Sequence, residues 1–327
     1  MNAARRVNLR DIAEASGVSI QTVSRAVRGL DVVAEPTRSR VMEAVERLGY
    51  RPNLAARSLS ARRTGQVHVI VAMPLYHGHA MTFVSICQEL AKLQLHAITT
   101  VPPAGSVRDL NPDDLVPVSA DGAIVIGGRM LPAPWVTGLA ARIPMVMVGR
   151  LHELPDSVPG VAVDHRAGAV EAVRHLVARG ARRVAHVAGP LSWVDAHLRL
   201  TGYLEVCAEA GIEPFVLEAD SWDARAAFPL MTDLPGDVDA VFAANDQLAL
   251  GCMTALQQRG LRVPDDVKVV GFDDIAGADA FLPALTTVRQ DFARVGELAV
   301  ASLSRILAGE PASLSTVTPS LVVRAST

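Results

Sequence analysis

The feature that most limits what this chain can fold into is a regular alternation of short apolar runs and amphipathic stretches from Gly65 onward. The apolar runs are of strand length, and the stretches between them repeat apolar residues at helical spacing. Continuous apolar strands joined through helices are typical of parallel sheets covered on both faces. The pattern therefore predicts an α/β body built on doubly wound parallel sheets.

The apolar runs fall into two series, which predicts two similar lobes. The expected strands of the first series are residues 67–74, 96–101, 122–126, 144–148 and 161–164, and those of the second are 183–188, 214–218, 240–243 and 267–272. Helices are expected at residues 81–93, 167–179, 196–210 and 247–258. Short links near Asp164 and Gln290 would let the chain cross between the lobes and leave a cleft. Ligands of such sheets bind beyond the carboxyl ends of the strands, so the residues that follow each strand are the candidates for a site.

A short helical segment with the pattern of a helix-turn-helix precedes the body. Residues 9–16 have helical spacing, and Gly17 supplies a tight turn. Ser19 is placed to cap a second helix, and a third helix is expected to open after Glu35 and to run to Gly49. In this arrangement the second helix presents its N-terminal side chains to the major groove of DNA.

The outward side chains of the second helix suit base recognition. Gln21 can bond adenine, Arg25 can bond guanine, and Ile20 can contact a thymine methyl group, with Thr22 beside them. An ordinary three-helix cap without a binding role is the alternative on this local pattern alone.

Charge divides the chain in the same place. Residues 1–65 hold twelve Arg and six Asp or Glu, whereas the remainder holds nineteen Lys or Arg and twenty-eight Asp or Glu. A basic head on an acidic body indicates that the head approaches a polyanion. An Arg-rich soluble face is the other interpretation of the charge alone.

Composition excludes several classes of protein. Cys87, Cys207 and Cys252 lie far apart and are odd in number, which argues against a disulfide framework. The apolar runs are too short to span a membrane, and the N-terminus lacks the apolar core of a signal peptide. We therefore expect a cytoplasmic protein with no membrane partner.

Catalytic and cofactor signatures are missing from the sequence. No GxGxxG follows the first expected strand, and no P-loop, GxSxG or HExxH motif occurs. Residues 77–79 (HGH) form a weak metal candidate that we interpret as an ordinary loop, and the acidic pairs at 265–266 and 273–274 are interpreted as a helix cap or a polar ligand group. We expect no enzyme activity, no cofactor and no metal.

The run LRDIAEASGVSIQTVSRAVRG at residues 9–29 resembles the DNA-reading motif of the lactose-repressor/galactose-repressor family of bacterial transcription factors. The resemblance continues through Thr37 and residues 48–59. It implies that residues 53–60 form a hinge helix that folds only on operator DNA, with Leu59 as a wedge in the minor groove. The DNA-binding residues that it implies are Ser19, Ile20, Gln21, Thr22, Ser24, Arg25, Thr37, Asn53, Ala56 and Leu59.

The body resembles the lactose-repressor branch of the same family. The matching blocks are AGPLSWVDAHLRLTGY (188–203), FAANDQLALGCMTAL (242–256), VVGFDD (269–274) and LTTVRQDF (285–292). They imply an α/β two-lobed, periplasmic-binding-protein-like body with a small-molecule effector in its cleft. The expected effector-binding residues are His79, Phe83, Arg199, Trp222, Asn245, Asp273, Gln290 and Phe292. This set suits a polyhydroxylated ligand, because a carboxylate accepts from neighbouring hydroxyls while Arg and Asn bond others.

Two departures from the branch concern the first lobe. Gly149 and Arg150 stand where the branch has an Asp, and residues 73–79 replace a serine-bearing loop. A carbohydrate therefore remains the expected effector, but not the same galactoside. No leucine heptad follows residues 320–323, so we expect a homodimer rather than a tetramer.

The expected organisation is a helix-turn-helix domain at residues 1–52, a hinge helix and linker at 53–65, and an effector-binding and dimerisation domain at 66–327. Within the last, the first lobe takes residues 66–163 and 292–319, and the second takes 164–290 and 320–327. The expected function is a homodimeric repressor that binds a near-palindromic, double-stranded operator and is released by a sugar. The alternatives are a regulator of this family with a non-sugar effector or corepressor and, in a different class, a solute-binding protein.

Overall fold

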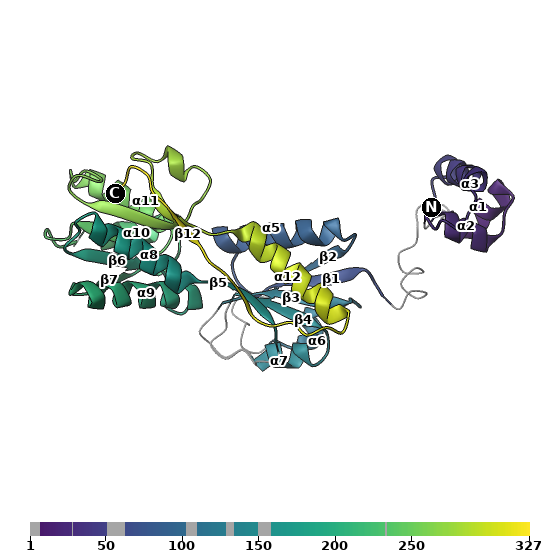
Figure 1. Ribbon diagram of the computed structural model, residues 1–327, viewed down its shortest axis with the longest axis horizontal. Helices are drawn as coiled ribbons and strands as arrows, with labels where there is room; N and C mark the ends of the chain where they lie inside the picture. Colours follow the sequence, from purple (N-terminus) through teal and green to yellow (C-terminus); the bar gives the residue numbers. More distant parts are fainter. Residues whose placement is uncertain are drawn as a thin grey trace, which may run out of the picture. The chain divides into compact units, whose positions relative to one another are not determined.

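The computed structural model describes residues 7–27, 29–50, 63–102, 110–128, 134–149, 158–232 and 234–327. The chain divides into two compact units, Met1–Thr64 and Gly65–Thr327, which we call the head and the body (Figure 1). In the described parts of the chain, no helix is both long and apolar enough to cross a bilayer.

The described part of the head consists of three helices around a small apolar core. They are α1 (Leu9–Ser16), α2 (Ile20–Val27) and α3 (Glu35–Leu48). Ile12, Val23 and Val41, one from each helix, are fully buried against one another. Gly17 adopts a left-handed conformation (φ 67°) that ends α1 and turns the chain into α2, as the sequence predicts.

The first lobe of the body is a six-stranded sheet with helices on both faces. Its order is β11-β5-β4-β3-β1-β2, and every pairing in it is parallel. The strands are β1 (Gln66–Val71), β2 (His96–Thr100), β3 (Gly122–Ile126), β4 (Met145–Val148), β5 (Gly160–Val163) and β11 (Ser315–Val317). The helices are α5 (His77–Lys92), α6 (Pro112–Leu115), α7 (Pro134–Ala140) and α12 (Phe292–Leu307).

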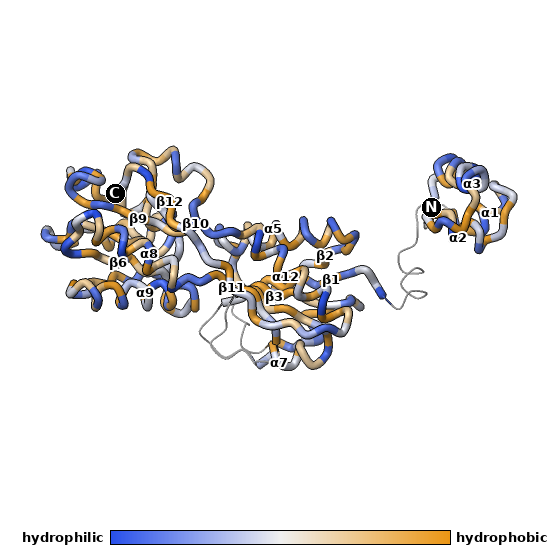
Figure 2. The backbone as a smooth tube through the Cα atoms, in the orientation of Figure 1, coloured by the Kyte–Doolittle hydropathy of each residue, from blue (hydrophilic) through white to orange (hydrophobic). Residues whose placement is uncertain are grey.

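Strand β1 shows why both faces of this sheet are covered. Val67 and Val69 lie in one apolar cluster with Ile86 of α5, whereas Ile70 lies in another with Trp135 of α7. Successive side chains of a strand point to opposite faces, so a continuous apolar strand needs a partner on each side. In Figure 2 the apolar colouring is found in the interior of this lobe, around the label β3.

The second lobe repeats this plan. Its sheet has the order β12-β10-β9-β8-β6-β7, in which only β12 runs antiparallel to its neighbour, β10. The strands are β6 (Val184–Ala188), β7 (Phe215–Glu218), β8 (Ala240–Ala243), β9 (Lys268–Asp273), β10 (Thr286–Arg289) and β12 (Ser320–Val322). Helices α8 (His165–Ala178) and α9 (Val194–Ala210) share one apolar cluster with this sheet, and α10 (Ala224–Leu230) and α11 (Asp246–Gln258) share the other.

The chain passes between the lobes more than once. It leaves the first sheet after β5 and returns to it through α12, which follows β10 of the second sheet. It then adds β11 to the first sheet and β12 to the second, so adjacent short strands lie in different lobes. The predicted fold class, a helical head and a body of two mainly parallel sheets, is confirmed.

The segment after β1 differs from the sequence prediction. The expected strand at residues 67–74 ends at Val71, and Met73 packs into the apolar core of the second lobe. The interpretation of residues 77–79 as a loop is wrong, because His77 begins α5. The helix predicted at residues 81–93 therefore starts four residues earlier, and this brings His79 onto a helix beside the second lobe.

Tyr203 of α9 is hydrogen-bonded to strands β6 and β7, and its substitution tests how much this link stabilises the second lobe. Its hydroxyl donates to the carbonyl of Val184 (2.8 Å) and accepts from the amide of Phe215 (2.8 Å). Tyr203→Phe leaves both groups without a partner, so we expect the free energy of unfolding of the body to fall by about 1–3 kcal/mol. Chemical denaturation measures it, with Tyr76→Phe as the matched control. Equal stability of the two variants would contradict this role for Tyr203.

Candidate functional site

The first turns of α2 form a polar, solvent-facing surface on the head. Ser19 caps the helix, because its Oγ accepts from the amide of Thr22 (3.1 Å) and bonds the Thr22 hydroxyl (2.8 Å). Ile20, Gln21 and Arg25 are exposed, Ile20 to 44 %. These three side chains can therefore meet a partner without any rearrangement of the helical core.

The other expected DNA-binding residues are less exposed or are not described. Ser24 and Thr37 are half-buried, on α2 and α3. Asn53, Ala56 and Leu59, together with the expected hinge helix at residues 53–60, lie outside the described residues.

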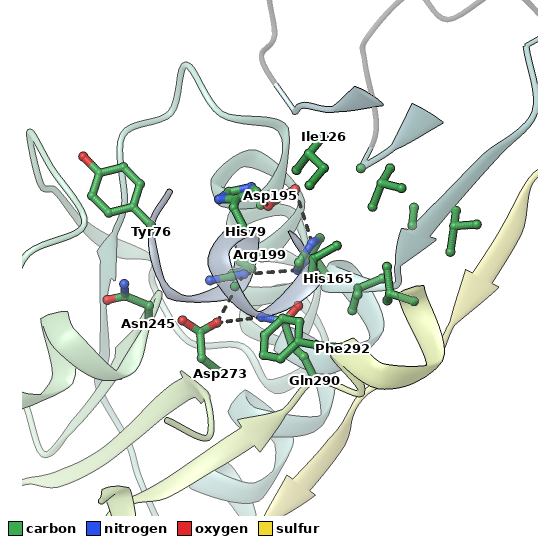
Figure 3. Close-up of a pocket in the computed structure, with 18 of the residues that line it drawn as sticks. Tyr76, His79, Ile126, His165, Asp195, Arg199, Asn245, Asp273, Gln290 and Phe292 are labelled. Atoms are coloured by element: carbon green, nitrogen blue, oxygen red, sulfur yellow. Dashed lines mark hydrogen bonds and ion pairs between the residues drawn. The ribbon is translucent and has the colours of Figure 1, made fainter. Parts of the chain in front are cut away.

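In the body, a cavity lies between the lobes at the carboxyl ends of strands from both sheets (Figure 3). From the first lobe it is lined by Tyr76, Gly78, His79, Thr82, Ile126, Val148, Gly149, Val161, Ala162, Val163, Phe292 and Val295; from the second, by His165, Asp195, Arg199, Trp222, Asn245, Asp273 and Gln290. Seven of the eight expected effector-binding residues are in this lining. The exception is Phe83, which packs against the apolar cluster between the first sheet and α12.

Arg199 is the central polar residue of the cavity. Its guanidinium lies 3.8 Å from Asp273 Oδ1, donates to the carbonyl of Ala244, and donates to His165 Nδ1 (3.2 Å from Nη2). It also stacks 3.9 Å above the ring of Phe272. Burial lowers the pKa of Arg199, and the neighbouring Asp273 opposes that shift. The arginine is thus held by the second lobe with one edge toward the cavity.

Asp273 ends β9 in a strained backbone conformation. Its φ is 117°, which non-glycine residues rarely adopt, and such strain is concentrated at functional sites. Gln290 donates to Asp273 Oδ1 (2.6 Å). Burial raises the pKa of Asp273, whereas Arg199 opposes the shift. In this conformation the carboxylate lies between Arg199 and Gln290.

Asn245 and Trp222 hold each other in place at the second-lobe wall. Asn245 caps α11, since its Oδ1 accepts from the amide of Leu248 (2.8 Å). Its Nδ2 donates to the carbonyl of Trp222 (3.1 Å). Trp222 is buried, and its Nε1 has no hydrogen-bond partner among the described residues. That indole N–H is therefore a buried donor without an acceptor among the described residues.

An acidic residue and a histidine of the lining, Asp195 and His165, were not among those expected. Asp195 lies one turn before Arg199 on α9, and His165 is the first residue of α8. His165 Nε2 is 3.2 Å from Asp195 Oδ1, and His79 Nε2 is 3.8 Å from Asp195 Oδ2. The i,i+4 spacing of Asp195 and Arg199 places both on one helix face, and this spacing could have indicated Asp195 from the sequence.

The backbone explains why glycine stands at position 149, where the lactose-repressor branch has an Asp. Gly149 has a φ of 92°, and a Cβ atom there would overlap the carbonyl oxygen of Gly127. A side chain therefore does not fit at this position with the present backbone. Ile126, Val148 and Val163 make the adjoining wall apolar, and Arg150 lies outside the described residues.

The acidic and histidine motifs of the sequence do not form a metal site in the described part of the chain. No group of three or more His, Cys, Asp or Glu there has an arrangement that could hold an ion. Asp265 and Asp266 instead pair with Arg262.

Beneath the cavity lies a second buried carboxyl group, Asp246. Its Oδ1 accepts from the hydroxyl of Thr287 (2.5 Å), and its Oδ2 accepts from the amide of Ile275 (2.8 Å). Burial, and then the nearby Asp273, raises the pKa of Asp246 to about 8. Asp246 is thus a structural group whose charge depends on pH.

Comparison with known proteins decides which family this arrangement represents. Residues 8–53 match the profile described as bacterial regulatory proteins, lacI family, and residues 173–327 match that of a periplasmic binding protein-like domain. The chain is 31% identical to the lactose operon repressor of Escherichia coli (strain K12), over 98% of this chain and 91% of that repressor. The chain belongs to the lacI family of bacterial regulatory proteins.

Other similar proteins agree with this family. The regulator CelR of Thermobifida fusca is 34% identical over 94% of each chain. Among solved structures, a lac repressor dimer bound to operator and the anti-inducer ONPF has a TM-score of 0.85 at 29% identity, covering 99% of both chains. A CelR–cellobiose complex has a TM-score of 0.74 at 30% identity, covering 98% of this chain and 100% of that one.

Membership of the lacI family confirms the resemblance seen in the sequence. The protein is a DNA-binding transcriptional regulator, and the relatives that it matches are regulators. A solute-binding protein accounts for the body but not for the match of residues 8–53, so that alternative is set aside.

Asp246 gives a prediction about pH. Its folded pKa lies above its ordinary value, so its stabilising contribution is complete below about pH 4 and is lost as the pH rises toward 8. The loss is at most about 1.4 kcal/mol per pH unit. Asp246→Asn lacks one acceptor and should be less stable in acid, but it cannot ionise. Its free energy of unfolding, relative to the parent, should therefore rise between about pH 5 and pH 8.

Chemical denaturation at several pH values makes this comparison. Asp265→Asn, at an exposed carboxylate, is the control and should follow the parent. Parallel pH profiles for Asp246→Asn and the parent would show that Asp246 does not titrate in this way.

Proposed function

We propose that this regulator is a homodimeric repressor that binds a near-palindromic operator and is released when a sugar occupies the cavity between the lobes. The observation that carries the proposal is the buried Arg199–Asp273–Gln290 group in that cavity, which offers paired donors and acceptors beside an aromatic wall. Such a set suits the hydroxyl groups and C–H face of a carbohydrate. The role is one of regulation in the cytoplasm, without catalysis.

The proposed domains follow the expected boundaries. Residues 1–52 read DNA, 53–65 form the hinge and linker, and 66–327 bind the effector and dimerise, with the first lobe at 66–163 and 292–319 and the second at 164–290 and 320–327. The likeness to a lac repressor dimer bound to operator supports the dimer and the operator. A two-fold symmetric protein recognises two related half-sites, hence the near-palindrome.

The DNA contacts are proposed for the exposed end of α2. Ile20, Gln21 and Arg25 reach bases, because their side chains are free of the head's core. The supporting contacts are assigned to Ser19, Thr22, Ser24, Thr37, Asn53 and Ala56, with Leu59 inserted in the minor groove.

The effector contacts are proposed for the cavity lining. The residues are His79, Arg199, Trp222, Asn245, Asp273, Gln290 and Phe292; Phe83 is omitted because its side chain packs in the first-lobe core. The likeness to a CelR–cellobiose complex supports a carbohydrate in this position. An effector shifts the DNA-bound equilibrium only through a difference in affinity between two arrangements, and a site lined by both lobes responds to any change between them.

A second candidate is a regulator that a non-sugar metabolite tightens on DNA. The same cavity serves both, and the direction of the effect distinguishes them. Ligand-promoted binding to the operator would favour the corepressor, whereas ligand-promoted release would favour the inducer.

Arg25 tests the DNA half of the proposal. Selection from random duplexes with the parent defines the preferred site. Arg25→Ala should cost roughly 1–3 kcal/mol on that site and relax specificity at one base pair per half-site. Fluorescence anisotropy at fixed salt measures both effects, with Arg174→Ala on the body as control. An equal loss on scrambled DNA would make Arg25 a phosphate contact.

Asp273 tests the effector half. Asp273→Asn keeps the shape of the side chain but removes a charged hydrogen-bond acceptor, which costs about 1.5–3 kcal/mol, or ~10- to 150-fold in sugar affinity. The variant should bind operator normally and resist release as a sugar is added. Release at the parent's sugar concentration would contradict the mechanism, and Asp237→Asn, at an exposed carboxylate, is the control.

Arg199→Ala is a harsher change at the same site. Arg199 also bonds Ala244 and His165, so its removal leaves buried Asp273 without a cationic partner. Breaking a buried pair in this way costs about 3–5 kcal/mol. We expect loss of sugar response together with a lower melting temperature of the body, which makes Asp273→Asn the cleaner test.

A further inference from the structure

Beyond the Arg199–Asp273 pair, the cavity contains a second carboxylate with an imidazole on each side. Asp195 of α9 lies beside His79 of α5 and is bonded to His165 of α8 (Figure 3). His79 comes from the first lobe and the other two from the second. We call these three lining residues the Asp195 cluster, and the part of the cavity that they line its Asp195 end.

Hydrogen-bond roles fix the proton of His165. A guanidinium has only N–H groups, so Arg199 donates to His165 Nδ1, which must accept. The ring proton therefore lies on Nε2, which is 3.2 Å from Asp195 Oδ1 and donates to it. His165 is an uncharged donor to Asp195 in this arrangement.

His79, unlike His165, has a ring nitrogen without a hydrogen-bond partner among the described residues. Its Nε2 faces Asp195 Oδ2 at 3.8 Å, whereas its Nδ1 is buried and has no hydrogen-bond partner among the described residues. The ring packs against Trp193, 5.6 Å between centroids, and burial lowers the pKa of His79 although Asp195 opposes the shift. A neutral ring with its proton toward the carboxylate leaves Nδ1 as an unused acceptor.

The charge of Asp195 is therefore not matched by its imidazole neighbours. Burial acts to raise the pKa of Asp195, but the hydrogen bond from His165 and then the charge of Arg199 hold that pKa below its ordinary value. Arg199 itself is engaged with Asp273. Among the described residues, the Asp195 cluster thus holds a carboxylate and a buried ring nitrogen without a donor, both of which can accept hydrogen bonds.

We propose that Asp195 and His79 form an acceptor subsite that admits ligands with a hydroxyl or an ammonium group at this end and rejects those with a phosphate or a carboxylate there. This inference rests on the proposed sugar effector and narrows it to neutral and amine-bearing sugars. An anionic oxygen would face two acceptors and a like charge, whereas a donor satisfies the buried Nδ1 of His79.

Asp195 also determines which ring nitrogen of His79 carries the proton. In Asp195→Asn an amide N–H can face His79 Nε2, which then accepts and moves the ring proton to Nδ1. The subsite would change from acceptor to donor. The variant should therefore bind anionic sugars better and amine-bearing sugars worse than the parent.

Isothermal calorimetry at fixed pH tests this with matched probes. Glucose, galactose and cellobiose are the neutral probes, glucosamine and galactosamine the cationic ones, and glucuronate, galacturonate and glucose 6-phosphate the anionic ones. We expect the parent to prefer at least one neutral or amine-bearing probe over its anionic counterpart by at least tenfold. Asp195→Asn should reduce that preference at least tenfold.

Two further variants provide an independent test and a control. His79→Gln leaves the Asp195–His165 bond in place and should weaken binding of the preferred probe at least tenfold, even if Asp195→Asn fails to fold. Glu209→Gln, at an exposed carboxylate of α9 that pairs with Arg174, should match the parent.

The outcomes separate this inference from the proposed function. Binding of an anionic sugar as tightly as its neutral counterpart overturns the subsite and leaves a sugar regulator standing. An unchanged preference in Asp195→Asn, or unchanged affinity in His79→Gln, also overturns it. If no probe of the panel binds the parent, the sugar effector and the subsite both fail.

Discussion

A buried arginine organises the body of this regulator. Arg199 is 4% exposed, and a charge removed from water needs compensating partners. Those partners are the carbonyl after β8, the carboxylate at the end of β9 and the first side chain of α8. Because these groups belong to separate segments of the second lobe, satisfying one guanidinium fixes the positions of all of them.

The same constraint gives the cavity its chemistry. The groups that compensate Arg199 also line the space between the lobes, so their remaining lone pairs and protons face any ligand there. The first lobe contributes backbone at Gly149, an apolar wall, and the side chains of Tyr76, Thr82 and His79. The charged groups of the lining thus lie mainly in the second lobe, and the first lobe closes the space with fewer polar side chains.

Much of the fold and of the cavity lining could be predicted from the sequence. Buried strands appear in the sequence as continuous apolar runs, and the polar residues at their ends are candidates for the site: Asp273 ends β9, and Gln290 directly follows β10. The contact between His165 and Asp195 could not be predicted, because it depends on which faces of α8 and α9 meet; the sequence contains only the i,i+4 spacing of Asp195 and Arg199. The start of α5 at His77 has no capping side chain, so residues 77–79 lack the usual sequence signal of a helix N-terminus. The overlap that forbids a side chain at Gly149 involves Gly127, on a neighbouring strand end, and no local pattern reveals it.

The interleaved path of the chain limits how such a regulator can be recombined. The first sheet gains β11 and the second gains β12, although only Thr318 and Pro319 separate the two strands in the sequence. An exchange of one contiguous segment with a relative therefore never transfers a whole lobe. Chimeras that graft a foreign ligand pocket must cut at three places, near Asp164, near Gln290 and between β11 and β12. A chimera with a single junction within the body would combine, in at least one sheet, an edge strand from one parent with other strands from the second parent.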